Sequence, residues 1–494
     1  MNSIVCFALG ALVMLEPIVK EKSVNSSEEA IAKLSESKFF SLWSYPNIYR
    51  DENIAEKGSG HEMCDFFILS GDTAIIISDK SNEFVLRRGF ETAWNSWYRE
   101  SIFKSCDQLF GCYKWIKRTP ERVYLDKYCL NKFPFQLSQI KNFHLIAITD
   151  DIDTDRKSVG QFSYDFNSVN GKQSNTPFLI GRFKKNAPFI HVFNRSLFEL
   201  ILHNLVTITD FTSYLRSKEK AIENGTIIKA NCEEQILAAF LRNRTEINIV
   251  GHLRAHGEQY KFSENSWSDY LYTTSEDLVN SSYNALEHIL EIMSDSVVCA
   301  DVGTGKDNPI SFHENALRVL AEEPYISRKL LSRAFEDKFN EVPKNVRSSR
   351  LSPSLYFDDL VYVFLFVPQY NMDLEEYRKA RILLSTQYAT VVKYKNPQFK
   401  RVVVISTETK GHDTRSEDII AADCSIDFND EDNRFAEEIS RQFHILTHTH
   451  FTESKGAHIY KGASRSDRLK PKYRRNDLCS CGSGIKYKYC CLNK

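Results

Sequence analysis

Runs of apolar residues along the chain predict a mixed α/β fold. Residues 64–71 (CDFFILSG) and 73–80 (TAIIISDK) are short, apolar and rich in β-branched side chains, and the Gly-Asp pair at 71–72 between them predicts a hairpin. Tryptophans and other apolar residues at helical spacing follow over 91–117, and a further strand is expected at 143–150. The order strand, strand, helix, strand is typical of a mixed sheet covered by helices.

The remaining pattern divides the chain further. A helix is expected in 26–43 and a loop in 44–60, and the region from 205 to 340 is mainly helical. Two apolar strands around a charged helix, followed by an acidic helix, then predict a second α/β unit. We therefore expect an N-terminal extension (1–25), an α/β domain (26–150), a mainly helical α/β region (151–345), a second α/β unit (346–453), a basic linker (454–473) and a small cysteine-bearing end (474–494).

Composition limits the class of protein. The chain has 494 residues, a mean hydropathy of −0.38 and a formal net charge of −1, so overall charge implies no polyelectrolyte partner. The apolar run Ile4–Leu15 is too short to span a bilayer and has no basic residues ahead of it. Translation could begin at Met1 or at Met14. We expect a cytoplasmic protein without a membrane segment.

The cysteines are distributed unevenly. Most of the 12 stand alone, as free cytosolic thiols do, but Cys479, Cys481, Cys490 and Cys491 are crowded into the last sixteen residues. Two close pairs separated by a glycine-bearing turn can surround one tetrahedral ion, and four thiolates suit Zn²⁺. A closed shell of four cysteines leaves no position for substrate, so this zinc would be structural. The alternative is four thiols without a ligand.

The end of the chain is also basic. Residues 454–494 contain eleven Lys or Arg and two Asp or Glu. A basic segment on a nearly neutral body suggests an anionic partner, such as nucleic acid, the ribosome or an acidic protein surface. A solvated linker is the alternative.

Residues 475–491, RNDLCSCGSGIKYKYCC, resemble the SEC-C motif, the zinc knuckle at the C-terminus of the SecA translocation ATPase and of many other bacterial proteins. Leu478, Ser480 and Ile485 depart from the family pattern, but none is a ligand position. The resemblance implies zinc binding by the four cysteines and docking on nucleic acid, a ribosome or a chaperone. It does not reveal the activity of the body. The basic residues that could contact nucleic acid are Arg474, Arg475, Lys486 and Lys488.

The predicted hairpin carries the candidate chemistry. Asp65 opens one strand, the next strand ends in Ser78-Asp79-Lys80, and Glu62 lies just upstream. Carboxylates hold Mg²⁺, and a neighbouring lysine can orient water and offset negative charge in phosphodiester hydrolysis. Because side chains alternate along a strand, Ser78 and Lys80 are expected on one face and Asp79 on the other.

These residues resemble the core of the PD-(D/E)XK nuclease superfamily. Asp65 matches the metal-binding Asp of that family and Lys80 matches its Lys. Glu62 could stand for an additional acid, and Gln108 is a candidate for the Gln on the following helix. The resemblance covers about residues 26–150 and implies a Mg²⁺ site at Asp65.

The match departs from the family where Ser78 takes the position of an acid, so that Asp79 is the nearest carboxylate and the second candidate Mg²⁺ ligand. Two readings follow: a metal-dependent nuclease, or a non-catalytic adaptor with a degenerate nuclease fold that docks through its zinc tail. An unrelated α/β domain, with strand-end charges only, is the third.

Overall fold

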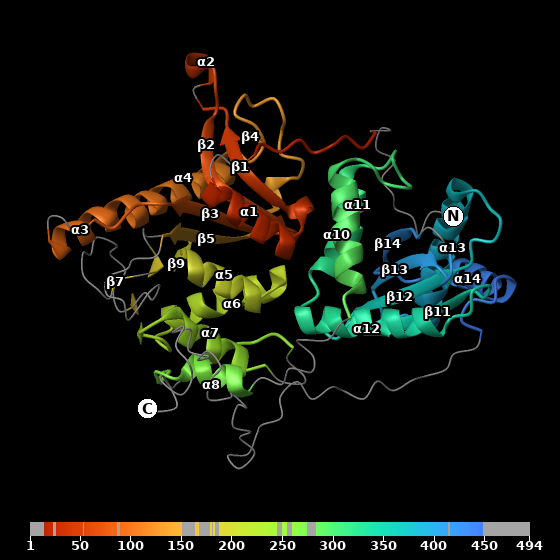
Figure 1. Ribbon diagram of the computed structural model, residues 1–494. Coiled ribbons are helices and arrows are strands. Elements are labelled where there is room, and N and C mark those ends of the chain that lie inside the picture. Colours follow the sequence, from red (N-terminus) through yellow and green to blue (C-terminus); the bar gives the residue numbers. More distant parts are fainter. Residues whose placement is uncertain are drawn as a thin grey trace, which may run out of the picture.

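Two large mixed sheets, each covered by helices, form the main body of the described residues in a computed structural model (Figure 1). The expected mixed α/β fold class is confirmed. The structure describes residues 14–22, 26–52, 54–85, 89–150, 164–166, 178–179, 181–182, 187–244, 249–253, 259–273, 283–412 and 415–447.

The first sheet has the strand order β4-β1-β2-β3-β5-β9-β8. Strands β1, β2 and β3 are antiparallel neighbours, whereas β3, β5 and β9 run parallel to one another. The parallel step from β3 to β5 requires a crossover connection, which the helical stretch between them provides. The strand bounds are β1 Ser44–Arg50, β2 His61–Ser70, β3 Thr73–Lys80, β4 Val123–Tyr124, β5 Asn142–Thr149, β8 Gly181–Arg182 and β9 Phe189–Asn194.

Helices cover both faces of this sheet. The crossover consists of α3 (Phe90–Trp97), a π-helical turn (Tyr98–Phe103) and α4 (Lys104–Arg118), and α4 lies on one face (Figure 1). On the other face, Phe39 and Phe198 are both in ring contact with Phe211. These rings join three helices, α1 (Ser26–Phe39), α5 (Arg195–Asn204) and α6 (Ile208–Glu223).

Smaller elements complete the N-terminal unit. The described residues include a three-stranded sheet with the order β10-β6-β7. The bounds of these elements are 3-10 turns Ser41–Trp43 and Leu137–Gln139, α2 Ile54–Lys57, β6 Tyr164–Asp165, β7 Phe178–Leu179, β10 Lys229–Ala230, α7 Glu233–Arg242 and α8 Ser266–Thr273.

The second unit is a four-stranded sheet between two helical layers. Its strand order is β11-β12-β13-β14, and alternate residues of the central strands face opposite cores. Tyr362 and Phe364 face α10, α11 and α12, whereas Val361 and Val363 face α13 and α14. The bounds are α10 Ala285–Val298, α11 Ile310–Ala321, α12 Tyr325–Glu341, β11 Ser348–Pro353, β12 Leu360–Val367, α13 Leu374–Lys395, β13 Arg401–Glu408, β14 Glu417–Asp423 and α14 Asp430–Gln442.

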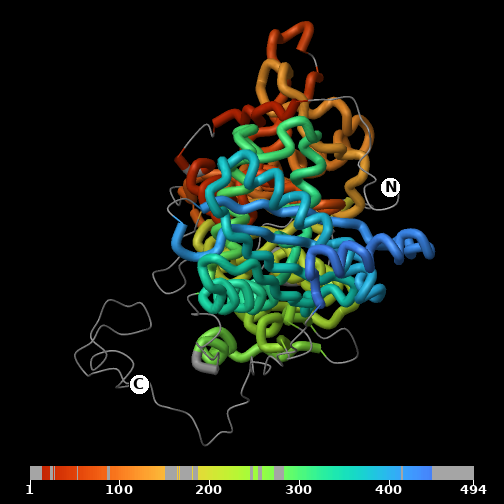
Figure 2. The backbone as a smooth tube through the Cα atoms, turned by 90° about the vertical axis from the view of Figure 1, so that its right-hand side faces the viewer, coloured from red at the N-terminus to blue at the C-terminus, as the bar shows by residue number. Residues whose placement is uncertain are grey.

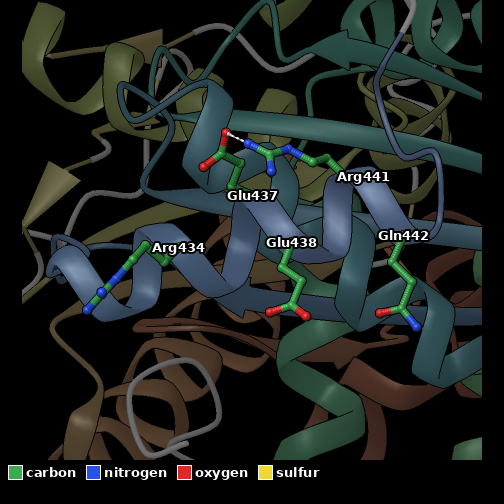
Figure 3. Close-up of a pocket in the computed structure, with 5 residues that line it drawn as sticks. All are labelled: Arg434, Glu437, Glu438, Arg441 and Gln442. Carbon is green, nitrogen blue, oxygen red and sulfur yellow. Dashed lines mark hydrogen bonds and ion pairs between the residues drawn. The ribbon is translucent and has the colours of Figure 1, made fainter.

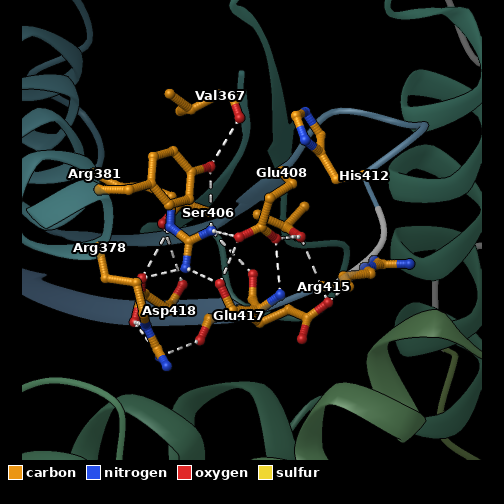
Figure 4. A network of polar contacts seen from close by, with 12 residues as sticks. Val367, Arg378, Arg381, Ser406, Glu408, His412, Arg415, Glu417 and Asp418 are labelled. Atoms are coloured by element: carbon orange, nitrogen blue, oxygen red, sulfur yellow. Dashed lines mark hydrogen bonds and ion pairs between the residues drawn. The ribbon is translucent and has the colours of Figure 1, made fainter. Parts of the chain in front are cut away.

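A buried arginine ties this second unit together. Arg381 of α13 is 1% exposed, and its guanidinium pairs with Glu408 of β13 at 3.0 Å and with Asp418 of β14 (Figure 4). Arg378 also pairs with Asp418, at 2.6 Å. The crossover helix is thus fixed to both strands by charge-assisted hydrogen bonds.

The two units pack directly on each other. The Leu42 backbone N–H donates to Ser294 Oγ at 2.9 Å, and Trp43 Nε1 donates to Glu314 Oε1 at 3.0 Å. These bonds join the 3-10 turn Ser41–Trp43, just before β1, to α10 and α11, which lie between the two large sheets (Figure 1). Seen after a quarter turn, the second unit stands in front of the first (Figure 2).

Two expectations need correction or adjustment. The loop expected at 44–60 is wrong over Ser44–Arg50, which forms β1 between β2 and β4, because sheet neighbours on both sides hold the segment extended. The first sheet also continues past residue 150, because β9 pairs with β5. Among the helices of the described ranges, none has both the length and the apolar composition needed to cross a bilayer.

Candidate active site

Side chains from three elements meet at the end of the β2–β3 hairpin. Asp65 lies on β2 and is 5% exposed. Lys80, the last residue of β3, places its Nζ 3.6 Å from Asp65 Oδ2. Gln108 of α4 donates from Nε2 to Asp65 Oδ1 at 3.4 Å. The hairpin and its following helix therefore bring Asp65, Lys80 and Gln108 together around one carboxylate.

Strand alternation explains why Ser78 joins this group. Phe66 pairs with Ile77 in the β2–β3 register, so Ser78 lies across from Asp65 on the same face as Lys80. The Ser78 hydroxyl donates to Gln108 Oε1 at 3.1 Å. Ser78 therefore holds the amide of Gln108 in the orientation in which its NH₂ group faces Asp65.

A β-bulge brings Glu62 to the same face. In a regular strand, residues three apart point to opposite sides. In the β1–β2 register Ile48 pairs with Cys64, but Tyr49 pairs with Glu62, so β2 holds one extra residue at Met63. The extra residue restores Glu62 to the side of Asp65, and the two carboxyl groups are hydrogen-bonded to each other.

Glu62 holds its proton more tightly than a free glutamate because of its surroundings. Burial, the hydrogen bond to Asp65 and repulsion from its charge raise the pKa of Glu62 from 4.5 to about 7, against the attraction of Lys80. Glu28, from the first turn of α1, adds to the repulsion. A bound cation would offset this repulsion, and the two carboxyl groups offer it several oxygen atoms.

The Asp79 side chain points away from this group. Its carboxylate pairs with Arg195 of α5 at 2.9 Å, and the same guanidinium reaches Asp150 at 3.0 Å. The Asp79 backbone N–H does reach the site, where it donates to Asp65 Oδ2. Asp79 was expected to share a Mg²⁺ ion with Asp65, and the geometry does not bring their carboxylates together, because odd-numbered residues of β3 face α5 and α6.

Two participants were not foreseen from the sequence. Glu28 lies near Glu62 although 34 positions separate them; an acidic first turn on the helix before the sheet was the available signal. Arg195, which holds Asp79, begins the helix that follows β9, and nothing in the local pattern indicated its partner.

The expected zinc ligands and nucleic-acid contacts lie outside the described residues. They are Cys479, Cys481, Cys490 and Cys491, and Arg474, Arg475, Lys486 and Lys488. Within the described part, a hollow beside α14 is lined by five side chains of that one helix, with Glu437 and Arg441 paired (Figure 3). All five side chains are polar and come from a single helix, whereas the side chains around Asp65 come from three different elements and meet at one point.

Comparisons with known proteins identify the C-terminal end. The SEC-C motif matches residues 475–493, which supports zinc binding there. The UPF0225 protein plu2503 of Photorhabdus laumondii is 34% identical over 88 residues, which are 18% of this chain and 50% of that protein. The chain thus spans about half the length of this curated relative. No solved structure is significantly similar to this chain. The chain is a mixed α/β protein that carries a SEC-C motif.

Proposed function

We propose that the N-terminal unit is a Mg²⁺-dependent nuclease that hydrolyses phosphodiester bonds, and that the SEC-C end is a structural zinc knuckle. The observation that carries the nuclease proposal is the bulge at Met63, which sets Glu62 beside Asp65 and within the field of Lys80. A bulge that re-aims an acidic side chain beside a buried carboxylate is typical of functional sites.

The residues present fit a hard divalent cation. Asp65 and Glu62 supply carboxylate oxygens, the donor type that Mg²⁺ prefers, and the repulsion between them, which helps to raise the pKa of Glu62, is one that a cation would relieve. When bound, Mg²⁺ would offset the negative charge of the phosphate and lower the pKa of a bound water. Gln108 would keep Asp65 oriented through its amide hydrogen bond.

Lys80 would act directly on the substrate. Its side chain is 31% exposed while its ammonium group stays 3.6 Å from Asp65, so it borders both solvent and the buried acid. From there it can orient the attacking water and offset the negative charge that develops on the phosphate. The acid missing at Ser78 is supplied by Glu62, so the ligand set that we propose is Asp65 and Glu62, without Asp79.

The tail would add binding. We propose that Cys479, Cys481, Cys490 and Cys491 hold Zn²⁺ and that Arg474, Arg475, Lys486 and Lys488 contact the phosphates of nucleic acid. A cytoplasmic location agrees with the seven free cysteines of the described residues, because thiols persist in a reducing compartment.

A cleavage assay tests the proposal. The full chain is incubated with Mg²⁺ or Mn²⁺ and with single- and double-stranded DNA and RNA. We expect metal-dependent cutting that Asp65→Asn, Glu62→Gln and Lys80→Ala abolish or reduce at least about 100-fold. Asp79→Asn is the matched control: it removes the acid next to Lys80 in sequence but on the other face, and it should keep the activity.

A second function is favoured by one observation, the serine at position 78. If Ser78 marks a degenerate site, the chain is an adaptor that docks on a ribosome, a chaperone or nucleic acid through its zinc tail. No cutting of any substrate with either metal would support this reading. Binding that is lost on Cys490→Ser would then locate the contact in the tail.

A further inference from the structure

A second cluster of potential metal ligands lies on the opposite face of the first sheet. His144 of β5 and His191 of β9 both contact Glu219 of α6: His144 Nδ1 is 3.0 Å and His191 Nε2 is 2.9 Å from Glu219 Oε1. One ligand atom from each residue lies within 4.8 Å of the others. The side chains of the histidines are 3% and 0% exposed, and that of Glu219 is 19% exposed.

Sheet register fixes this arrangement. His191 pairs with Ile146, and His144 lies two residues before Ile146, so both imidazoles project from the same face. His144 also pairs with Ile75 of β3, which places it on the face of odd-numbered β3 residues. Lys80 projects from the other face, so this cluster is separate from the candidate active site.

The surroundings favour a bound cation. Among the described residues, no lysine or arginine pairs with Glu219; its neighbour Lys218 is instead committed to Glu233, with Nζ 2.6 Å from Oε2. The His191 ring packs between Phe189 and Phe193. A carboxylate with two imidazoles is a donor set that first-row divalent metals, and zinc in particular, accept readily.

We propose that His144, His191 and Glu219 bind a Zn²⁺ ion that joins α6 to β5 and β9. The two His–Glu219 contacts, 3.0 and 2.9 Å long, need to lengthen by only a few tenths of an ångström, because tetrahedral zinc ligands are roughly 3.4 Å apart for bond lengths of about 2.1 Å. The partial exposure of the Glu219 side chain leaves a path from solvent to the ligand atoms.

The outer ring nitrogens set the expected affinity. His144 Nε2 and His191 Nδ1 are buried and have no hydrogen-bond partner among the described residues. Zinc-bound histidines usually donate that N–H, and loss of such a partner costs about 10- to 100-fold in affinity. The site should therefore bind zinc more weakly than the tail cysteines, and it should be measured without competing chelators.

X-ray absorption spectroscopy on the full chain tests the site. In a Cys490→Ser, Cys491→Ser protein, which lacks the tail site, we expect zinc bound by nitrogen and oxygen with two imidazole ligands. The Asp65 group contains no histidine, so imidazole scattering distinguishes the two sites. Bound zinc without imidazole ligands, or no zinc retained at micromolar concentrations, would overturn the proposal.

Variants add a second measurement by zinc titration in the same background. His144→Gln and Glu219→Gln should each weaken binding at least 10-fold, whereas His203→Gln, which changes an exposed histidine of α5, should leave it unchanged. Equal affinity in all four proteins would contradict the assignment. If a variant of the histidine–glutamate site fails to fold, the X-ray absorption spectrum of the Cys490→Ser, Cys491→Ser protein, in which that site is unchanged, still tests the proposal.

Discussion

The raised pKa of Glu62 predicts that Glu62→Gln stabilises the protein, but only at neutral and alkaline pH. The folded state raises the pKa of Glu62 from 4.5 to about 7, so between these values the folded chain binds more protons than the unfolded chain. Stability is therefore lost as pH rises through this window. Glutamine resembles the protonated acid and does not suffer the loss.

The size of the effect follows from the shift. About 2.5 pKa units correspond to roughly 3.4 kcal/mol. Because Glu62 is only partly buried and solvent screens part of the repulsion, we expect about 1–2 kcal/mol above pH 7. Below about pH 5 the variant and the parent should have nearly equal stability.

Urea unfolding of both proteins at pH 5 and pH 8, without divalent metal, measures this difference. The exposed Glu121→Gln serves as the control for loss of a surface charge and should change stability little at either pH. A Glu62→Gln protein that is no more stable than its parent at pH 8, or is equally stabilised at both pH values, would refute the coupling of the two acids.

Three further predictions concern the scaffold and the tail. Arg381→Met should destabilise the second unit by about 3–5 kcal/mol, because Glu408 loses its buried partner. Thermal unfolding measures this loss, and a change below about 1 kcal/mol would contradict the prediction. Glu233→Gln should cost a similar amount, because it leaves the fully buried Lys218 without a counter-charge, and urea unfolding would show a loss. Cys491→Ser should remove the tail zinc, measured as metal content, while the far-ultraviolet circular dichroism of the body stays unchanged.

The strands that could be predicted from the sequence are those whose own residues have a strong apolar, β-branched pattern. The hairpin of β2 and β3 follows from two apolar runs around a Gly-Asp turn, and β12 follows from LVYVFLFV, which is buried on both faces. β1 could not be predicted this way. Its SYPNIYR sequence contains Pro, Asn and Arg, and only pairing with β2 and β4 makes it a strand.

The candidate site was predictable in part for the same reason. Strand alternation alone separates Lys80 from Asp79, and the structure has Lys80 beside Asp65 and Asp79 beside Arg195. The bulge was not predictable. Met63 and Cys64 are both buried, so the hydrophobic pattern does not show where the register shifts, and the shift decides which face Glu62 occupies.

The bulge leads to a rescue experiment that rests on the proposed nuclease activity. Ser78 lies across from Asp65, where the proposed nuclease mechanism calls for an acid, and Glu62 reaches the same carboxylate from the other direction. If the two positions serve one metal ion, Ser78→Asp should restore cleavage to a Glu62→Gln protein. We expect recovery of at least about tenfold over Glu62→Gln alone, whereas Asp79→Glu in the same background should restore nothing. Equal activity of the single and double variants, in a protein whose parent cuts, would show that position 78 cannot reach the metal and that Glu62 acts in another way.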